Sequence, residues 1–570
     1  MPENERPVVV DETRGDNGRN RDPELDQLMK YLSELSETII AETDEDAKQT
    51  LIACHSLTLR VETCIQELGP HIKGLVKWRK LSFVVERLIQ DAKFNAIASF
   101  LDSISGAEEE LFGELCNGEH SYFVIRAALR KFVTLCADIN SSENENLKKC
   151  AKSMKPLTKL FAEDIIKKLR NKYSSLLFRD LIQAHCGVLI ASEKTPDGMP
   201  EIECRVKELS KSNRKQFGEI CAAILAIDNL PDLATCEKAS PALGEMLVVV
   251  KESREDWVAE IVKHFTPSKE VVNSYLKSAA ASHFLERLIY AMNEDLLKDF
   301  YNNWMRGRLE ELVLHLNGNF VLQRVITHSS LALFKLIMNQ LNALGSLKQA
   351  WINGKGGIIA RIVSKCGSME EEKQIEMMKT LEITVNSSDN FVEDLLIENK
   401  YGELKVNYQG SIIAQAVMEY KGRARKILID GLVKIEADKL KAIFDSSAGS
   451  YLLESMSNNI PDKKFCEMLR TLPMSDIAFG RFGSRAVESI WKKKNMKVTQ
   501  VLCECLADVH AELGQSQFGR HVNAKLRVTE FVRNKDRWMQ NQNNNQGNDK
   551  AGNKQGRYAE PMRKKKKFGN

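Results

Sequence analysis

A short pattern recurs along most of this chain, and it limits the fold more than any other feature does. Its clearest copy reads Gly318-Asn319-Phe320-Val321-Leu322-Gln323-Arg324-Val325-Ile326. Related copies begin at residues 82, 122, 175, 240, 282, 319, 356, 410, 450, 484 and 519. Most copies are 34 to 42 residues apart, with longer steps after 122, 175 and 356. A helical repeat of this length predicts an α-solenoid, in which stacked units share one continuous core.

The repeats also set the domain organisation. We predict an all-α array of about eleven repeats over residues 25–540, with about two helices in each repeat. Insertions are expected near 191–215, where Pro196, Gly198 and Pro200 break helices, and near 386–407. Residues 1–24 are polar and charged, and residues 541–570 are an Asn/Gln-rich stretch with a basic tail. Both ends are therefore expected to be disordered.

Composition and missing motifs exclude several classes of protein. No apolar run approaches the roughly 18 residues of a membrane span, and residues 1–24 lack the apolar segment of a secretory signal. The thirteen cysteines form no C-x-x-C pair, which favours buried reduced thiols over disulfides or a zinc site. Phosphate-loop, metalloprotease and hydrolase motifs are also missing. We predict a protein that is not an enzyme, uses no cofactor or metal and contacts no membrane.

The net charge of +4 is concentrated at the C-terminus. Residues 557–570 alone carry a net charge of +5, which leaves about −1 for the rest of the chain. The net charge of the repeats therefore does not attract nucleic acid, and any affinity must come from how particular side chains are placed. The basic run itself predicts a nuclear or nucleolar targeting signal or an electrostatic contact with RNA. The alternative is a charged end that only increases solubility. The run consists of Arg563, Lys564, Lys565, Lys566 and Lys567.

Five positions in each repeat predict a surface that reads bases. When they are numbered from Asn319, positions one and five lie one helical turn apart on one face, and positions three and four face the core. Position two offers a ring or a long side chain that can stack between bases. The amides of Asn319 and Gln323 suit the edge of uracil, whereas a Ser–Glu pair suits the N1–H and amino groups of guanine. We therefore predict single-stranded RNA binding, with one base read per complete repeat.

The candidate RNA-binding residues follow from this numbering. They are Ser82, Phe83, Glu86, Tyr122, Arg126, Ser282, His283, Glu286, Asn319, Phe320, Gln323, Ser450, Tyr451, Glu454, Ser484, Arg485, Glu488, Arg520 and Asn523. Phe83 and Tyr122 fit a core position equally well, and one Ser–Glu pair on a helix is commonly only solvated. The pairs Ser240–Gly244, Gly356–Ala360 and Gly410–Ala414 lack reading groups. The RNA sequence that is read should therefore be short and partly degenerate.

These motifs resemble those of a known family. Asn319-Phe320-Val321-Leu322-Gln323 is similar to the uracil-reading motif of the Pumilio-like (Puf) repeat family, and Ser484-Arg485-Ala486-Val487-Glu488 is similar to its guanine-reading motif. The eleven units resemble its nucleolar branches. The segments Phe479-Gly480-Arg481-Phe482-Gly483 and Gln517-Phe518-Gly519-Arg520 resemble the nucleolar protein nine branch in particular. The resemblance covers about residues 25–540.

This resemblance implies a curved, right-handed α-solenoid in the nucleus and nucleolus. It implies binding to precursor ribosomal RNA near the 3′ end of the small-subunit RNA, and a role in small-subunit (18S) rRNA maturation and ribosome biogenesis. Pre-ribosomal particle proteins are the implied partners, and a monomer is the implied state. The antiparallel polarity of the family implies 5′-UG-3′ for the repeats at 319 and 282, and 5′-GG-3′ for those at 484 and 450.

Two other functions remain open on the sequence alone. A nucleolar Pumilio-like protein that binds nucleic acid without sequence preference would carry basic residues where this chain has Ser–Glu and Asn–Gln pairs. A protein-binding α-solenoid scaffold would use the same helices as a peptide groove. Such a groove would not need the same reading chemistry in repeat after repeat.

Overall fold

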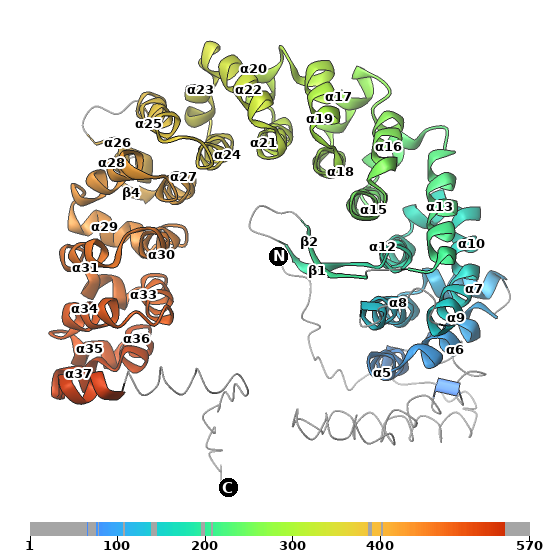
Figure 1. The fold of residues 1–570 in the computed structure, drawn as a ribbon, viewed down its shortest axis with the longest axis horizontal. Coiled ribbons are helices and arrows are strands. Elements are labelled where there is room, and N and C mark those ends of the chain that lie inside the picture. The colour runs from blue at the N-terminus through green and yellow to red at the C-terminus, as the bar shows by residue number, and fades with distance from the viewer. Residues whose placement is uncertain are drawn as a thin grey trace, which may run out of the picture. The chain divides into compact units, whose positions relative to one another are not determined.

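A computed structural model describes residues 65–66, 76–77, 79–106, 109–137, 145–194, 200–206, 209–385, 390–400 and 403–541. The basic run at Arg563–Lys567 therefore lies outside the described residues. The chain divides into two compact units, which we call the N-terminal unit (up to Leu297) and the C-terminal unit (from Lys298). Within each unit, helices stack repeat after repeat (Figure 1). The predicted α-solenoid is confirmed, and all eleven copies of the pattern fall on helices.

Each complete repeat has three helices rather than the two that we expected. A short first helix leads into a second helix that carries the pattern, here called the motif helix, and a third helix packs behind it. In the N-terminal unit the motif helices are α5 (Arg79–Gln90), α8 (Ser121–Ala137), α12 (Lys172–Cys186), α15 (Ala239–Ser253) and α18 (Ala279–Ala291). The first helices there are α7 (Glu109–Asn117), α11 (Ile165–Arg170), α14 (Leu230–Thr235) and α17 (Lys269–Lys277). Behind the motif helices lie α6 (Phe94–Ser105), α9 (Glu145–Ser153), α10 (Lys155–Glu163), α13 (Lys211–Leu225), η1 (Glu255–Trp257) and α16 (Val258–Phe265).

The C-terminal unit repeats the same three-helix plan. Its motif helices are α21 (Gly318–His328), α24 (Gly356–Cys366), α27 (Tyr408–Met418), α30 (Gly449–Asn459), α33 (Gly483–Lys492) and α36 (Gly519–Leu526). The first helices are α20 (Leu309–Leu314), α23 (Ser346–Ile352), α26 (Phe391–Leu396), α29 (Ala437–Phe444), α32 (Met474–Phe479) and α35 (His510–Gln515). The third helices are α22 (Leu331–Ala343), α25 (Glu371–Val385), α28 (Gly422–Val433), α31 (Asp462–Thr471), α34 (Met496–Leu506) and α37 (Val528–Arg533). In the sequence, α19 (Glu294–Phe300) and the π-helix η2 (Tyr301–Met305) lie where the units meet.

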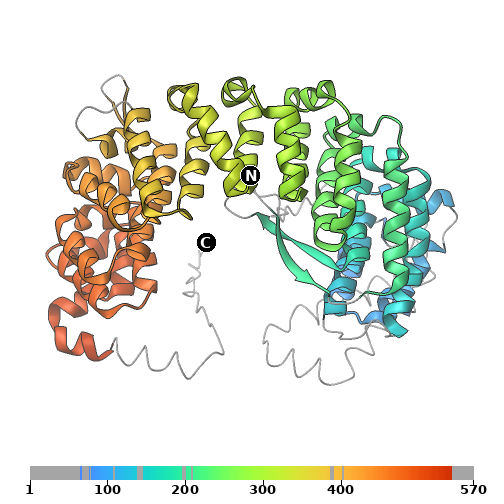
Figure 2. The same ribbon diagram turned by 45° about the horizontal axis from the view of Figure 1, so that its top comes forward.

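Two antiparallel hairpins interrupt the helical plan at the places where insertions were expected. In the first, β1 (Val188–Lys194) pairs with β2 (Pro200–Arg205), and the hairpin projects from the end of α12 (Figure 2). In the second, β3 (Ile397–Lys400) pairs with β4 (Glu403–Val406) between α26 and α27. Gly187 ends α12 in the left-handed conformation, at φ 65°. Because a residue without a Cβ adopts that conformation without strain, the chain can turn there from helix into strand.

A glycine fixes where several motif helices begin. The backbone N–H groups of Gly318, Gly410, Gly449 and Gly519 each donate to a capping side chain three residues earlier, at 3.0, 3.0, 3.0 and 2.8 Å. At Gly449, an added Cβ would collide with the carbonyl oxygen of Ile443 at the end of α29. Only glycine therefore lets the motif helix start this close to the first helix of its repeat. Position one is the residue that follows this glycine.

The core of each unit lies between the motif helices and the helices behind them. At positions three and four, Val321, Leu322, Leu452 and Leu453 are buried as predicted. Eleven cysteines within the described residues are free, and burial raises the pKa of Cys116 to about 12. In the part of the chain that the structure describes, no helix is long and apolar enough to cross a membrane, and no cluster of three His, Cys, Asp or Glu side chains could hold a metal.

A buried histidine should make the N-terminal unit sensitive to acid. His185 lies 2.8 Å from the hydroxyl of Thr158, and burial lowers the pKa of His185 from 6.5 to about 3. The unfolded chain takes up this proton near pH 6.5, whereas the folded chain does so only near pH 3. The stability that neutral His185 contributes is therefore complete above pH 6.5 and is lost as the pH falls toward 3. Between pH 7 and 4.5, the loss should be about 2–3 kcal/mol.

The check is a comparison of chemical unfolding at pH 7 and pH 4.5. His185→Gln should lose about 2–3 kcal/mol less than the wild-type protein over this range. His283→Gln, which removes an exposed histidine, should follow the wild-type pH dependence. If wild-type protein and His185→Gln had parallel pH profiles, the assigned role of His185 would be wrong.

Candidate nucleic-acid interface

The motif helices form one row in each unit. In the N-terminal unit, α5 packs against α8, α8 against α12, α12 against α15 and α15 against α18. In the C-terminal unit, the row runs from α21 through α24, α27, α30 and α33 to α36 (Figure 1). Because all members of a row have the same orientation relative to their neighbours, equivalent positions of successive repeats come to lie beside one another. Each row is thus a periodic surface with one set of motif positions per helix.

The side chains at position two are the most exposed part of this surface. Phe83, Phe320 and Tyr451 are 46%, 51% and 61% exposed, and the His283 side chain is 77% exposed. Arg485 is exposed as well. Phe83 is therefore a surface residue, which settles one of the two alternatives for it. Large rings held open to solvent on a packed scaffold are suited to stacking with planar groups such as bases.

The side chains at position one are much less accessible than the repeat pattern predicted. Ser82, Ser282, Asn319, Ser450 and Ser484 are only 2% to 8% exposed. The four serine hydroxyls donate to backbone carbonyl groups three residues earlier, in or just before their own helices, at 2.8 to 3.3 Å. The Asn319 amide nitrogen donates to the carbonyls of His315 and Leu316, at 2.8 and 2.7 Å. In this structure, position one shapes the helix start and leaves position five as the more accessible polar group.

The side chains at position five are half-buried and present the polar groups of each repeat. The Gln323 amide donates to the Asn319 side-chain oxygen at 3.1 Å, so Asn319 holds Gln323 in place. Next to it, the small Gly357 of the following repeat leaves room for the Gln323 amide. Glu286 lies 3.1 Å from the His283 ring, and Glu488 is paired with Lys525 of the next repeat. Near Glu454, the Lys493 amine of the next repeat donates to the Glu454 backbone carbonyl at 3.3 Å.

Two repeats are one residue out of the register that the sequence suggested. Because the capped glycines define the helix start, Ser411 rather than Gly410 occupies position one, and Gln415 rather than Ala414 occupies position five. Burial agrees, since Ser411 is 0% and Ile412 is 36% exposed. The repeat therefore has a polar amide after all, which the sequence reasoning missed. The capping residue Asn407, three residues before the glycine, was the available signal.

The last repeat shifts in the same way. Arg520 follows the capped Gly519 and occupies position one, which places the exposed His521 at position two. Asn523 moves to position four, where its side chain bonds the backbone N–H and hydroxyl of Thr529, each at 3.1 Å. Asn523 therefore closes the turn into α37, because its amide is used there. The exposed His521, and not Asn523, is therefore the candidate RNA-binding residue of this repeat.

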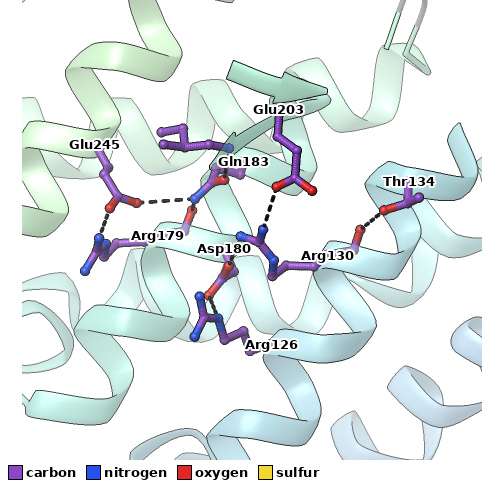
Figure 3. A network of polar contacts seen from close by, with 9 residues as sticks. Arg126, Arg130, Thr134, Arg179, Asp180, Gln183, Glu203 and Glu245 are labelled. Carbon is purple, nitrogen blue, oxygen red and sulfur yellow. Dashed lines mark hydrogen bonds and ion pairs between the residues drawn. The ribbon is translucent and has the colours of Figure 1, made fainter. Parts of the chain in front are cut away.

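The middle of the N-terminal row has ion pairs in place of reading pairs (Figure 3). The buried Asp180 lies 3.0 Å from Arg126 and 3.5 Å from Arg130, both on α8. Arg179 pairs with Glu245 of α15. Burial raises the pKa of the Asp180 carboxyl, and the three nearby guanidinium groups oppose that rise. The Arg126 side chain is thus engaged by Asp180, so its predicted RNA contact would have to compete with a buried ion pair.

The first hairpin is tied to this network. Gln183 of α12 accepts from the Ile190 N–H at 2.8 Å and donates to Glu245 at 3.3 Å. From β2, Glu203 reaches Arg130 at 3.2 Å (Figure 3). The hairpin therefore covers part of the row at α8 and α12 and neutralises further positive charge there.

Tyr122 belongs to the core. It is 5% exposed, and its ring centroid lies 4.1 Å from that of Phe123 and 5.4 Å from that of Tyr173. Of its two sequence interpretations, the structure thus supports the core position. The half-buried Phe123 takes position two of this repeat.

Comparison with known families gives one match over more than half of the chain. The model described as "NOP9-like PUF repeat domain" matches residues 211–521. Mouse Nucleolar protein 9 is 22% identical over 304 residues, which are 47% of this chain and 47% of that protein. Pumilio homolog 23 from Arabidopsis thaliana is 21% identical over 293 residues, which are 48% of this chain and 39% of that protein. The matched region thus spans less than half the length of these relatives.

A solved structure supports the same fold. The structure described as APUM23–GGAAUUGACGG aligns with a TM-score of 0.67 and 17% identity, over 92% of this chain and 99% of that chain. At this level of identity, the likeness establishes the architecture of stacked repeats. It therefore agrees with the three-helix repeats and motif rows described above.

Proposed function

Because the chain belongs to the NOP9-like PUF repeat family, we propose that it binds single-stranded RNA along its rows of motif helices. The observation that carries this proposal is the C-terminal row, where the exposed rings of Phe320 and Tyr451 and the exposed Arg485 stand beside polar side chains at position five. Bases can stack on the groups at position two while the groups at position five meet base edges. Binding of this kind requires no catalytic group, cofactor or metal.

The proposed sequence preference follows from the chemistry at position five. The carboxylates of Glu488 and Glu454 can accept from the N1–H and amino group of guanine. The amides of Gln415 and Gln323 each offer a donor and an acceptor, which suits the edge of adenine or of uracil. With the antiparallel polarity implied above, the repeats at 484 and 450 would read 5′-GG-3′, followed by adenine or uracil at the repeat that begins at 411. The RNA named with the APUM23 structure, GGAAUUGACGG, begins with GGA, which fits this order, and has uracil at its fifth and sixth positions.

The biological setting is proposed from the relatives. The mouse and human relatives are named Nucleolar protein 9, which supports a nuclear and nucleolar location for this chain. We further propose that the RNA is precursor ribosomal RNA near the 3′ end of the small-subunit sequence, and that binding serves 18S rRNA maturation. Pre-ribosomal proteins would be its partners, and the chain would act as a monomer with a basic tail that addresses it to the nucleus.

The test is equilibrium binding of the full chain to labelled 5′-GGAAUUGACGG-3′ and to scrambled RNA of the same composition. Phe320→Ala and Tyr451→Ala should each weaken binding by roughly fivefold to hundredfold, because stacking on an aromatic side chain contributes about 1–3 kcal/mol per base. Since both rings are exposed, unfolding should stay within about 0.5 kcal/mol of wild type.

Ile383→Ala is the matched control. Ile383 is 73% exposed on α25, away from the motif row, so its loss should leave RNA binding unchanged. Equal affinity for the two RNAs would favour the sequence-nonspecific alternative. Absence of RNA binding would refute the proposal and favour a protein-binding scaffold.

A further inference from the structure

A broad basic pocket opens at the start of the motif helices in the middle of the N-terminal unit. Its volume is about 780 Å³. The lining residues come from α7, α11, the start of α12 and the residue before α15, so three successive repeats contribute to it. The side chains that matter here are Lys167, Arg170, Lys172, Tyr173 and Lys238, with Asp164 as the acidic member.

The charges in this pocket are poorly compensated. Four cationic side chains face one carboxylate, and the contact between Lys167 and Asp164 is long, at 3.9 Å. Within the described residues, Arg170, Lys172 and Lys238 form no ion pair, and all three are exposed. Like charges gathered around one pocket repel each other unless an anion joins them. The pocket is thus suited to a ligand with several negative charges.

The Tyr173 ring lies where the pocket meets the motif helix α12. Tyr173 lines the pocket, and its ring centroid lies 5.4 Å from that of Tyr122 at position one of α8. The Lys172 amine lies 5.0 Å from the centre of the Tyr173 ring. Cations interleaved with rings are typical of surfaces that follow a nucleic-acid backbone without reading its sequence. Because Tyr173 lies two residues before position one of α12, the pocket borders the N-terminal row, and a strand lying on that row would reach it.

The positive charge of the pocket comes from basic side chains and not from uncapped backbone N–H groups at the start of α12. The Asn171 side chain already caps α12 by accepting from the N–H groups of Tyr173 and Ser174, at 2.9 and 3.1 Å. The basic side chains extend from the surface around this capped start. The motif helices α8, α12 and α15 are also those whose position-five side chains are ion-paired or absent, as in Arg126, Arg179 and Gly244. These repeats lack base-reading groups and have a cationic pocket instead.

We propose that this pocket binds the phosphodiester backbone of the same RNA that the motif rows hold, as a contact that does not depend on sequence. The proposal rests on the RNA-binding function above and adds a second kind of contact to it. Nucleotides that flank the read sequence would be held here through their phosphates. The pocket would raise affinity and salt dependence without changing which bases are preferred.

The experiment compares wild-type full-length chain with a triple variant, Arg170→Gln, Lys172→Gln and Lys238→Gln. The probe is 5′-GGAAUUGACGG-3′ with and without six uridines added at either end, measured between about 0.05 and 0.2 M salt. Loss of three phosphate contacts should lower the slope of log affinity against log salt by about 2, and should weaken binding at 0.1 M salt at least about tenfold. Only an extended probe should show the full difference, and the ratio of affinities for matched and scrambled probes should not change.

The control variant carries Lys155→Gln, Lys335→Gln and Lys379→Gln, three exposed lysines outside the pocket. It should bind as wild type does. If wild-type protein prefers the matched probe but the pocket variant keeps its affinity and salt slope, the pocket assignment is overturned while RNA reading stands. If a labelled hexaglutamate peptide competes as well as the extended RNA and depends on the pocket residues, the site binds acidic proteins instead. Loss of all sequence preference in wild type would point to failure of the proposed function itself.

Discussion

Asp180→Asn is expected to lower the free energy of unfolding of the N-terminal unit by about 1.5–3 kcal/mol. The Asp180 side chain is 4% exposed and lies between Arg126 and Arg130, with Arg179 as its neighbour in the helix. The substitution keeps the shape of the side chain and removes its charge. Two partly buried guanidinium groups then lose their counter-charge, and each lost pairing costs far more here than at a solvated surface.

Glu203→Gln is the matched control for this prediction. It removes the other acidic partner of Arg130, but the Glu203 side chain is 54% exposed, so the cost should stay below about 1 kcal/mol. Urea unfolding at pH 7, followed by circular dichroism, gives both values. Equal losses in the two variants, or a loss below about 1 kcal/mol for Asp180→Asn, would show that the network does not hold α8 and α12 together.

The same network explains why the N-terminal row differs from the C-terminal one. At position five of α8 and α12, the side chains are arginines whose charges meet Asp180 and Glu245. A base approaching this part of the row would meet paired charges and the first hairpin, whereas a base over α30 would meet an uncovered ring and a carboxylate. If the proposed function holds, the repeats with glutamine or glutamate at position five would read bases, and those with ion-paired arginines would hold the strand.

Much of this organisation could be predicted from local sequence. The repeat period and the apolar pairs at positions three and four predicted eleven motif helices, because those pairs must face a core in every repeat. The short first helices were missed, since α20, α26 and α32 have only six residues each and show little periodicity. The strand β1 begins with Val188-Leu189-Ile190, an apolar run that fits a buried helix as well as a strand.

Other features depend on residues that are far apart in the chain. The burial of position one could not be deduced from spacing, because it depends on the contact between the motif helix and the end of the preceding short helix. Asp180 and Arg130 are 50 residues apart, and the basic pocket collects side chains from Asn117 to Lys238. No pattern within one repeat indicates such pairings. The shifted register at Ser411 was different, since the capping Asn407 was visible in the sequence.

Asn319→Ser combined with Gln323→Glu is expected to reverse the base preference of one repeat from uracil to guanine. The new pair would copy Ser450 and Glu454, whose serine donates to the Ser447 carbonyl just before α30 and whose glutamate side chain is half-buried. A carboxylate accepts the two N–H donors of guanine but repels the carbonyl oxygens of uracil. A well-placed pair of hydrogen bonds discriminates between bases by about 1–3 kcal/mol. Wild type should therefore bind the uracil RNA roughly tenfold to a hundredfold more tightly than the guanine RNA, and the double variant should show the opposite ratio.

The measurement uses 5′-GGAAUUGACGG-3′ and two versions in which the fifth or the sixth base is changed to guanine. Wild type should favour the original RNA, and the double variant should favour one of the substituted RNAs, which also identifies the base that lies over α21. Gln349→Glu introduces the same charge on an exposed face of α23 and should leave the preference unchanged, although general repulsion can weaken all three complexes alike. If the double variant lost affinity equally for the three RNAs, position five would not contact a base edge. The Asn319–Gln323 pair would then serve only to shape the helix start.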